Sequence, residues 1–204
     1  TAADLENMKA IIRESMEEGA FGLSTGLDYP PGNYADTDEL VALSRKVTEL
    51  GGIYHTHVRY RLGDRYLGPF REAIEIGRRS GVPIHITHFY QRSPSPGGGQ
   101  RLLRLVEDAH ESGQDVTFDS YPYIYGSTRI LIVFPDWAHD GGPEKLKDVL
   151  RSDDGRKRLR QEVGPRSPSW DDMWLTYFKR PENHRYEGKS IAEVAEAMGM
   201  HPVD

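Results

Sequence analysis

Four short apolar segments at regular distances constrain the fold most strongly. They begin near residues 20, 53, 82 and 116, and amphipathic helical patterns lie between them. A spacing of roughly thirty residues fits one strand and one crossover helix, the βα unit. Four such units in a row predict an α/β protein, either a barrel or a doubly wound sheet. The first strand-to-helix turns lack Gly-x-Gly-x-x-Gly, which disfavours a dinucleotide-binding fold.

The patterns predict where these elements lie along the chain. The expected strands are 20–25, 53–57, 82–88 and 116–120, with 173–178 as a fifth candidate. The expected helices are an N-terminal one, one capped by Thr37, 69–80, 100–112, 143–162 with a possible break at Gly155, and a short one after Ser190.

The rhythm breaks after residue 121, and 121–172 is expected to be a lid or insertion on the active-site side. A complete barrel needs about 250 residues and eight strands. The chain has 204 residues, and it starts without an initiator Met. We therefore expect 1–204 to be an internal fragment of a barrel, containing its central and later βα units.

Composition excludes several kinds of partner. The net charge is −6, which argues against a nucleic-acid-binding role. The chain contains no cysteine, so it has no disulfide framework. It has neither a transmembrane-length apolar run nor a signal segment at its start. These features predict a cytoplasmic protein without a membrane partner, and they leave the oligomeric state open.

Two histidines mark the ends of neighbouring predicted strands. His57 ends 53–57 and His88 ends 82–88. In a parallel barrel the carboxyl ends of the strands meet at one mouth, so these two imidazoles can share a metal ion. Catalytic zinc sites usually take three protein ligands and a water, so a third ligand must come from elsewhere. The competing interpretations are hydrogen-bonded structural histidines, or a pair made by His55 and His57 on one strand.

Strict strand alternation places the remaining histidines of these strands. It predicts His55 on the face of His57, one layer deeper. It predicts His88 on the face of Ile86, and His85 turned toward the helices.

The end of the fourth predicted strand carries a polar and aromatic group. Asp119, Tyr121 and Tyr123 alternate there, and Ser127 and Thr128 follow. These residues fit either a satisfied acid with packed aromatic rings, or hydroxyl groups that bind a substrate carboxylate or carbonyl.

An ordered set of motifs along nearly the whole chain resembles the N-acyl-D-amino-acid deacylases (D-aminoacylases) of the amidohydrolase superfamily. The motifs are Gly22-Leu-Ser-Thr-Gly-Leu27, Tyr29-Pro-Pro-Gly32, Thr56-His-Val-Arg59, Ile86-Thr-His88, Asp119-Ser-Tyr-Pro-Tyr123, Gly126-Ser-Thr128, Glu187-Gly-Lys-Ser190 and His201-Pro-Val-Asp204.

This resemblance implies a zinc-dependent (β/α)-barrel hydrolase that deacylates N-acyl-D-amino acids or related N-acyl compounds. It implies that His57 and His88 bind the zinc and that Tyr121 and Ser127 lie at the substrate. The loop with Tyr29 is implied to border the acyl-side-chain pocket.

The chain departs from the family at Tyr90. Most members have a lysine there, two residues after the second metal histidine, and it contacts the substrate carboxylate. Arg59 and Arg92 are the nearby cations that could replace it.

Three features of the family have no match in the chain: an early His-x-His, a metal-binding cysteine and a late catalytic aspartate. The first two would precede residue 1, and the aspartate would follow residue 204. We therefore assign no catalytic residue to this chain, and we expect the 204 residues alone to be inactive. The alternatives are a cyclic-amide hydrolase of the dihydroorotase or hydantoinase type, or a non-catalytic barrel fragment that acts as a binding domain.

Overall fold

The computed structural model describes residues 1–60, 62, 66–91, 97–163 and 169–204. The chain divides into two compact units, Thr1–Ser127 and Thr128–Asp204. The division falls inside the stretch 121–172. The role of that stretch as a lid or insertion stays a prediction.

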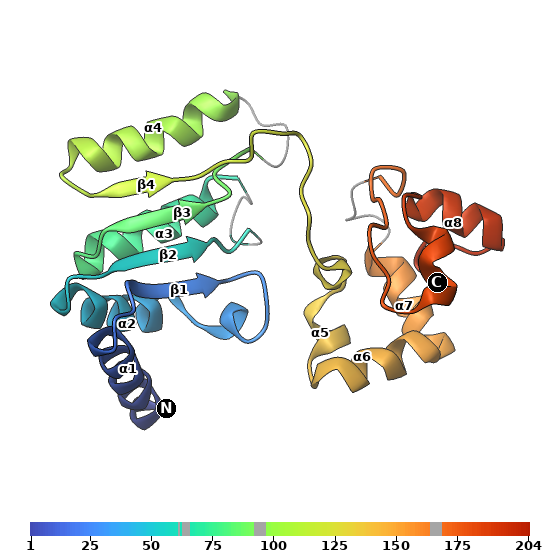
Figure 1. Cartoon of the computed structure of the whole chain (residues 1–204), viewed down its shortest axis with the longest axis horizontal. Coiled ribbons are helices and arrows are strands. Elements are labelled where there is room, and N and C mark those ends of the chain that lie inside the picture. Colours follow the sequence, from blue (N-terminus) through green and yellow to red (C-terminus); the bar gives the residue numbers. More distant parts are fainter. Residues whose placement is uncertain (61, 63–65, 92–96, 164–168) are drawn as a thin grey trace. The chain divides into compact units, whose positions relative to one another are not determined.

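The first unit is built on a four-stranded parallel sheet. Its strands are β1 (Gly22–Gly26), β2 (Ile53–His57), β3 (Ile84–Thr87) and β4 (Val116–Phe118), and they lie side by side in sequence order (Figure 1). A doubly wound sheet reverses its strand order at a switch point. The order β1-β2-β3-β4 has no such reversal, and it is the strand order of a parallel barrel.

Four α-helices accompany these strands: α1 (Ala2–Glu17), α2 (Thr37–Glu49), α3 (Gly68–Ser80) and α4 (Gly98–Glu111), with a 3-10 turn η1 (Gly32–Tyr34) after β1. The N-cap of α2 is Asp36 and not Thr37, so that prediction is wrong. The Asp36 carboxylate accepts from the Glu39 amide at 2.8 Å, as favoured at the positive end of a helix. The Thr37 hydroxyl donates instead to Glu72 Oε1 at 2.9 Å.

Alternation along the strands divides the sheet into two faces. Tyr54, Ile84 and Ile86 are fully buried in the core with residues of α2, α3 and α4. The residues that alternate with these buried ones lie on the opposite face of β2 and β3. They include His55 and His85, which the strand register pairs with each other. The prediction that His85 turns toward the helices is therefore wrong, because the apolar Ile84 and Ile86 occupy the helix-facing positions.

The second unit is helical in its described part. It contains α5 (Asp136–His139), α6 (Gly142–Arg151), α7 (Asp153–Val163) and α8 (Ile191–Met198), and the 3-10 turns η2 (Ile130–Val133) and η4 (Pro181–Tyr186). Its core is formed by Ala138, Leu146, Val149, Leu159, Val163 and Val203.

Two sequence predictions fail in the second unit. The helix is interrupted at Ser152 and not at the expected Gly155. The Ser152 hydroxyl accepts a hydrogen bond from the Gly155 amide at 3.0 Å, and a new helix, α7, begins after it. The expected strand 173–178 is also wrong. It makes one antiparallel bridge, Trp174 to Ser190, because the described residues beside it offer local turns and helices but no strand.

Gly22 is needed where β1 meets β2. A Cβ atom at this position would lie 1.9 Å from the Ile53 carbonyl oxygen, which belongs to the backbone and cannot rotate away. We expect Gly22→Ala to lower the free energy of unfolding by about 3 kcal/mol, the upper end of the usual effect of overpacking. Urea denaturation followed by circular dichroism measures this change. Gly99→Ala is the control, since a Cβ there meets no atom within 4 Å, and an equal loss in both variants would contradict the argument.

No described helix is long and apolar enough to cross a membrane.

Candidate active site

The structure brings His57 and His88 together. His57 is the last residue of β2, and His88 directly follows β3. Their ring centroids lie 5.3 Å apart, with the ring planes at 77°. The contact lies at the carboxyl ends of two adjacent parallel strands, where the sequence analysis expects it.

His88 reaches this position through its backbone conformation. It has a φ of 59°, in the left-handed region that non-glycine residues seldom adopt. Two hydrogen bonds hold it there: its amide donates to Asp119 Oδ1 at 2.9 Å, and the Tyr60 hydroxyl donates to its carbonyl at 2.8 Å. Strained residues of this kind are often found at functional sites. The turn ends the alternation of β3, so His88 does not follow Ile86 toward the helices.

Asp119 is the anionic centre of this region. Its carboxylate contacts the Thr87 hydroxyl at 2.7 Å and His85 Nε2 at 3.1 Å, in addition to the His88 amide. Burial raises the pKa of Asp119, but the hydrogen bonds from the His88 amide, the Thr87 hydroxyl and the His85 ring outweigh it and bring the pKa to about 2. Asp119 is therefore ionised at neutral pH.

Asp28 is a site residue that the sequence analysis missed. Its buried carboxylate lies 3.3 Å from His57 Nε2. The sequence motif begins at the next residue, Tyr29, yet Asp28 follows β1 by two residues, at the same end of the sheet as His57. That position after a strand is the signal by which it could have been found.

Aromatic rings extend the site on both sides of the histidine pair. The ring contacts run Tyr29–His57, His57–His88, His88–Tyr121 and Tyr121–Tyr90, with centroid distances of 5.3, 5.3, 5.0 and 5.8 Å. Five of the six residues singled out in the sequence thus form one continuous group. They line up from the loop after β1 to the segment after β4.

The remaining sequence candidates are Ser127, Arg59 and Arg92. Ser127 is exposed and makes no hydrogen bond to another described residue. Arg59 is a poor replacement for the family lysine, because its guanidinium donates to Glu72, to the Asn33 carbonyl at 2.7 Å and to the Ala35 carbonyl at 2.5 Å. Arg92 lies outside the described residues.

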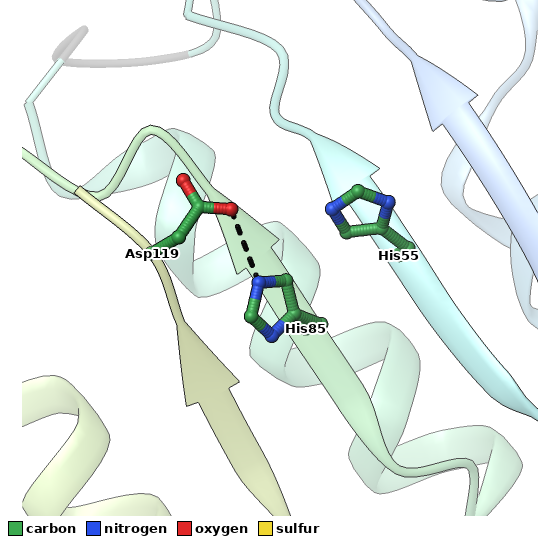
Figure 2. Close-up of side chains that lie close together, drawn as sticks. All are labelled: His55, His85 and Asp119. Carbon is green, nitrogen blue, oxygen red and sulfur yellow. Dashed lines mark hydrogen bonds and ion pairs between the residues drawn. The ribbon is translucent and has the colours of Figure 1, made fainter. Parts of the chain in front are cut away.

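A second cluster of possible metal ligands lies beside the histidine pair. Within the described part of the chain, one group of three such side chains has its ligand atoms all within 4.8 Å of one another: His55, His85 and Asp119 (Figure 2). The His57–His88 pair does not form a group of three with any described residue. The alternative pairing of His55 with His57 is disfavoured, because His55 contacts the ring of His85, with the two ring centroids 5.0 Å apart.

A parallel sheet in sequence order, with histidines at its strand ends, is similar to part of a metal-binding (β/α) barrel. Comparison with solved structures agrees, and each match covers the whole chain and 36% of the other. A D-aminoacylase mutant, D366A, in complex with CuCl2 is 29% identical with a TM-score of 0.70. The N-acyl-D-glutamate deacylase of Bordetella bronchiseptica, complexed with zinc and a phosphonate inhibitor, is 26% identical with a TM-score of 0.74.

The resemblance to the D-aminoacylases is also confirmed by sequence. The D-aminoacylase of Alcaligenes xylosoxydans xylosoxydans is 37% identical over 131 residues, which are 64% of this chain and 27% of that protein. The N-acyl-D-glutamate deacylase of the same organism is 34% identical over 133 residues, 65% of this chain and 27% of the relative. The chain thus spans about a quarter of the length of these relatives. No family model matches it.

Proposed function

We propose that this chain is part of a zinc-dependent amidohydrolase that removes the acyl group from N-acyl-D-amino acids. The observation that carries the proposal is the contact between His57 and His88 at two adjacent strand ends, in a chain 37% identical to a D-aminoacylase. The sequence relatives are a D-aminoacylase, an N-acyl-D-glutamate deacylase and an N-acyl-D-aspartate deacylase, which favours this reaction over cyclic-amide hydrolysis.

The residues present fit a zinc ion. A metal-binding histidine usually donates one ring N–H to a carboxylate or carbonyl, which fixes the tautomer and orients the ring. Asp28 is such a partner for His57 Nε2 at 3.3 Å, and it leaves Nδ1 as the donor nitrogen toward a metal. His57 and His88 would supply two ligands. Bound zinc supplies an activated water and polarises the scissile carbonyl.

The aromatic group would bind and orient the substrate. Tyr121 packs against His88, and Tyr29 packs against His57, so a substrate at the histidine pair would lie between these two rings. Tyr121 and Ser127 would hold the substrate through their hydroxyl groups. Tyr29 would border the acyl-side-chain pocket, and Tyr90 would lie at the substrate carboxylate. Placing the reacting amide in this way is a proximity effect.

The proposed function is tested by measuring how the protein encoded by the complete reading frame hydrolyses the D- and L-enantiomers of each substrate. The product of that frame is assayed on N-acetyl-D- and N-acetyl-L-amino acids with apolar, glutamate and aspartate side chains, before and after removal of zinc. We expect hydrolysis of D-substrates that is lost with the metal and restored by it. Zinc-independent activity, or none on any D-substrate, would overturn the proposal. The 204-residue chain serves as a parallel sample, and we expect it to be inactive.

The presence of Tyr90 in place of the lysine implied by the resemblance predicts a difference in substrate specificity. Its neutral hydroxyl replaces the ammonium group implied by the resemblance, and a charge-assisted hydrogen bond is about twice as strong as a neutral one. We expect Tyr90→Lys in the complete enzyme to raise kcat/KM on N-acetyl-D-amino acids about tenfold, the equivalent of 1–2 kcal/mol. Tyr90→Met is the control, because it matches lysine in length without the charge. An equal effect of both variants, or no gain with lysine, would mean that position 90 does not contact the carboxylate.

The cytoplasmic location remains a prediction from composition. A small N-acyl amino acid is the partner that we propose for this protein.

A further inference from the structure

We propose that His55, His85 and Asp119 form a binding site for a divalent transition-metal ion such as Zn²⁺, separate from the His57–His88 pair. The three residues come from β2, from β3 and from the segment after β4, and Figure 2 shows them on the same face of the sheet. Their ligand atoms lie within 4.8 Å of one another. The proposal concerns metal binding and does not depend on the deacylase function.

The hydrogen bonds around His85 define which ring nitrogen carries a proton. The Thr117 hydroxyl has one proton and donates it to the Ile84 carbonyl at 3.2 Å. The same hydroxyl lies 2.8 Å from His85 Nδ1, so it accepts a hydrogen bond from that nitrogen. A neutral His85 then has its lone pair on Nε2. This arrangement, with the far nitrogen held by a hydroxyl, is the outer-shell support that metal-binding histidines usually have.

The lone pair on His85 Nε2 faces a carboxylate oxygen. Asp119 Oδ2 lies 3.1 Å from this nitrogen. Two acceptors at this distance repel each other unless a cation lies between them. The cation is either a proton on His85 or a metal ion bound by both groups.

His55 favours the metal. Its ring centroid lies 5.0 Å from that of His85, and its imidazole makes no hydrogen bond to any described residue. A proton shared by His85 and Asp119 would give His55 no role, whereas two imidazoles and one carboxylate are a zinc ligand set that leaves the fourth position to water.

The distances are compatible with a small ion. Ligand atoms around tetrahedral zinc lie about 3.3 Å apart, so the contact between His85 and Asp119 already has the required spacing. His55 has to move closer by a side-chain rotation. The Asp119 side chain is about half exposed, so the ion has a path to it. Imidazole ligands favour zinc over magnesium or calcium, which prefer oxygen.

Asp119 connects this site to the histidine pair. One oxygen contacts His85, and the other lies 4.0 Å from His88 Nδ1. The two places are nevertheless separable by mutation, because His55 and His85 belong to one and His57 belongs to the other.

Zinc affinity of the 204-residue chain tests the site. Competition with a chromophoric chelator gives the affinity, and the absorption bands of bound Co²⁺ report tetrahedral coordination. We expect one zinc to be lost in His55→Gln and in His85→Gln, with at least a 100-fold weaker affinity, since outer-shell changes alone cost about 10–100-fold. His57→Gln should keep this zinc. His184→Gln, in the second unit, is the control and should bind as the unaltered chain does.

Thr117 allows a test that removes no ligand. Thr117→Val deletes the outer-shell hydroxyl at nearly constant volume and should weaken zinc binding about tenfold, whereas Thr117→Ser should retain the affinity. Circular dichroism of each variant shows that the sheet is intact. The proposal is overturned if the unaltered chain binds no zinc, if His55→Gln and His85→Gln bind as tightly as the unaltered chain, or if His57→Gln alone removes all binding.

Discussion

Replacing His57 by asparagine is expected to lower kcat/KM of the complete protein for the proposed hydrolysis of N-acyl-D-amino acids by roughly a thousandfold or more. Loss of an outer-shell partner of a metal typically reduces activity 10–100-fold, and loss of a ligand removes more. His57 also links four described neighbours, because its ring contacts His88, Tyr29 and Tyr60 and its Nε2 faces Asp28. The measurement is steady-state hydrolysis with the zinc content determined in parallel.

Two further variants separate a metal role of His57 from a structural one. Asp28→Asn keeps the size of the side chain but weakens the orientation of the imidazole, so we expect a smaller loss, of about 10–100-fold. His184→Asn is the control for a half-exposed histidine of the second unit and should leave the rate unchanged. If His57→Asn retained full activity and full zinc content, the assignment of His57 to the metal would be wrong.

Replacing Arg59 by methionine is expected to lower the free energy of unfolding by about 3–5 kcal/mol, the usual effect of removing one partner of a buried ion pair. Arg59 Nε lies 3.3 Å from Glu72 Oε2, and the Glu72 side chain is only 5% exposed. Without the guanidinium, the Thr37 hydroxyl would be the one donor left to Glu72 among the described residues. Arg59 also binds the Asn33 and Ala35 carbonyls, so its loss releases the loop that begins at Asp28.

Chemical denaturation of three variants measures this effect. The double variant Arg59→Met with Glu72→Gln should recover most of the loss, because no charge is then left buried. Arg78→Met, which breaks the exposed pair with Glu75, is the matched surface control and should unfold like the unaltered chain. Equal stability of Arg59→Met and Arg78→Met would show that the buried pair contributes nothing.

The sequence alone was sufficient for the layout of the first unit. Segment 53–57 is the strand β2 to the residue, and the other three predicted strands overlap β1, β3 and β4. Local rules sufficed because each βα unit carries its own apolar period and its own helix stop, such as Gly81 after α3. The motifs also led to the D-aminoacylases, which the comparisons bear out. In the second unit, where periods are short, the break near Gly155 and the strand 173–178 were wrong.

Only the tertiary structure decided how His88 turns toward His57 and which histidine lies beside His55. Alternation alone would turn His88 toward the helices with Ile86, but the Asp119 carboxylate and the Tyr60 hydroxyl hold it in a left-handed turn against His57. The register of β2 and β3 likewise placed His85 beside His55. These outcomes depend on hydrogen bonds between residues about thirty positions apart, which no local period encodes. Contacts between residues far apart in the sequence also place Asp28 beside His57 and bring His55, His85 and Asp119 together.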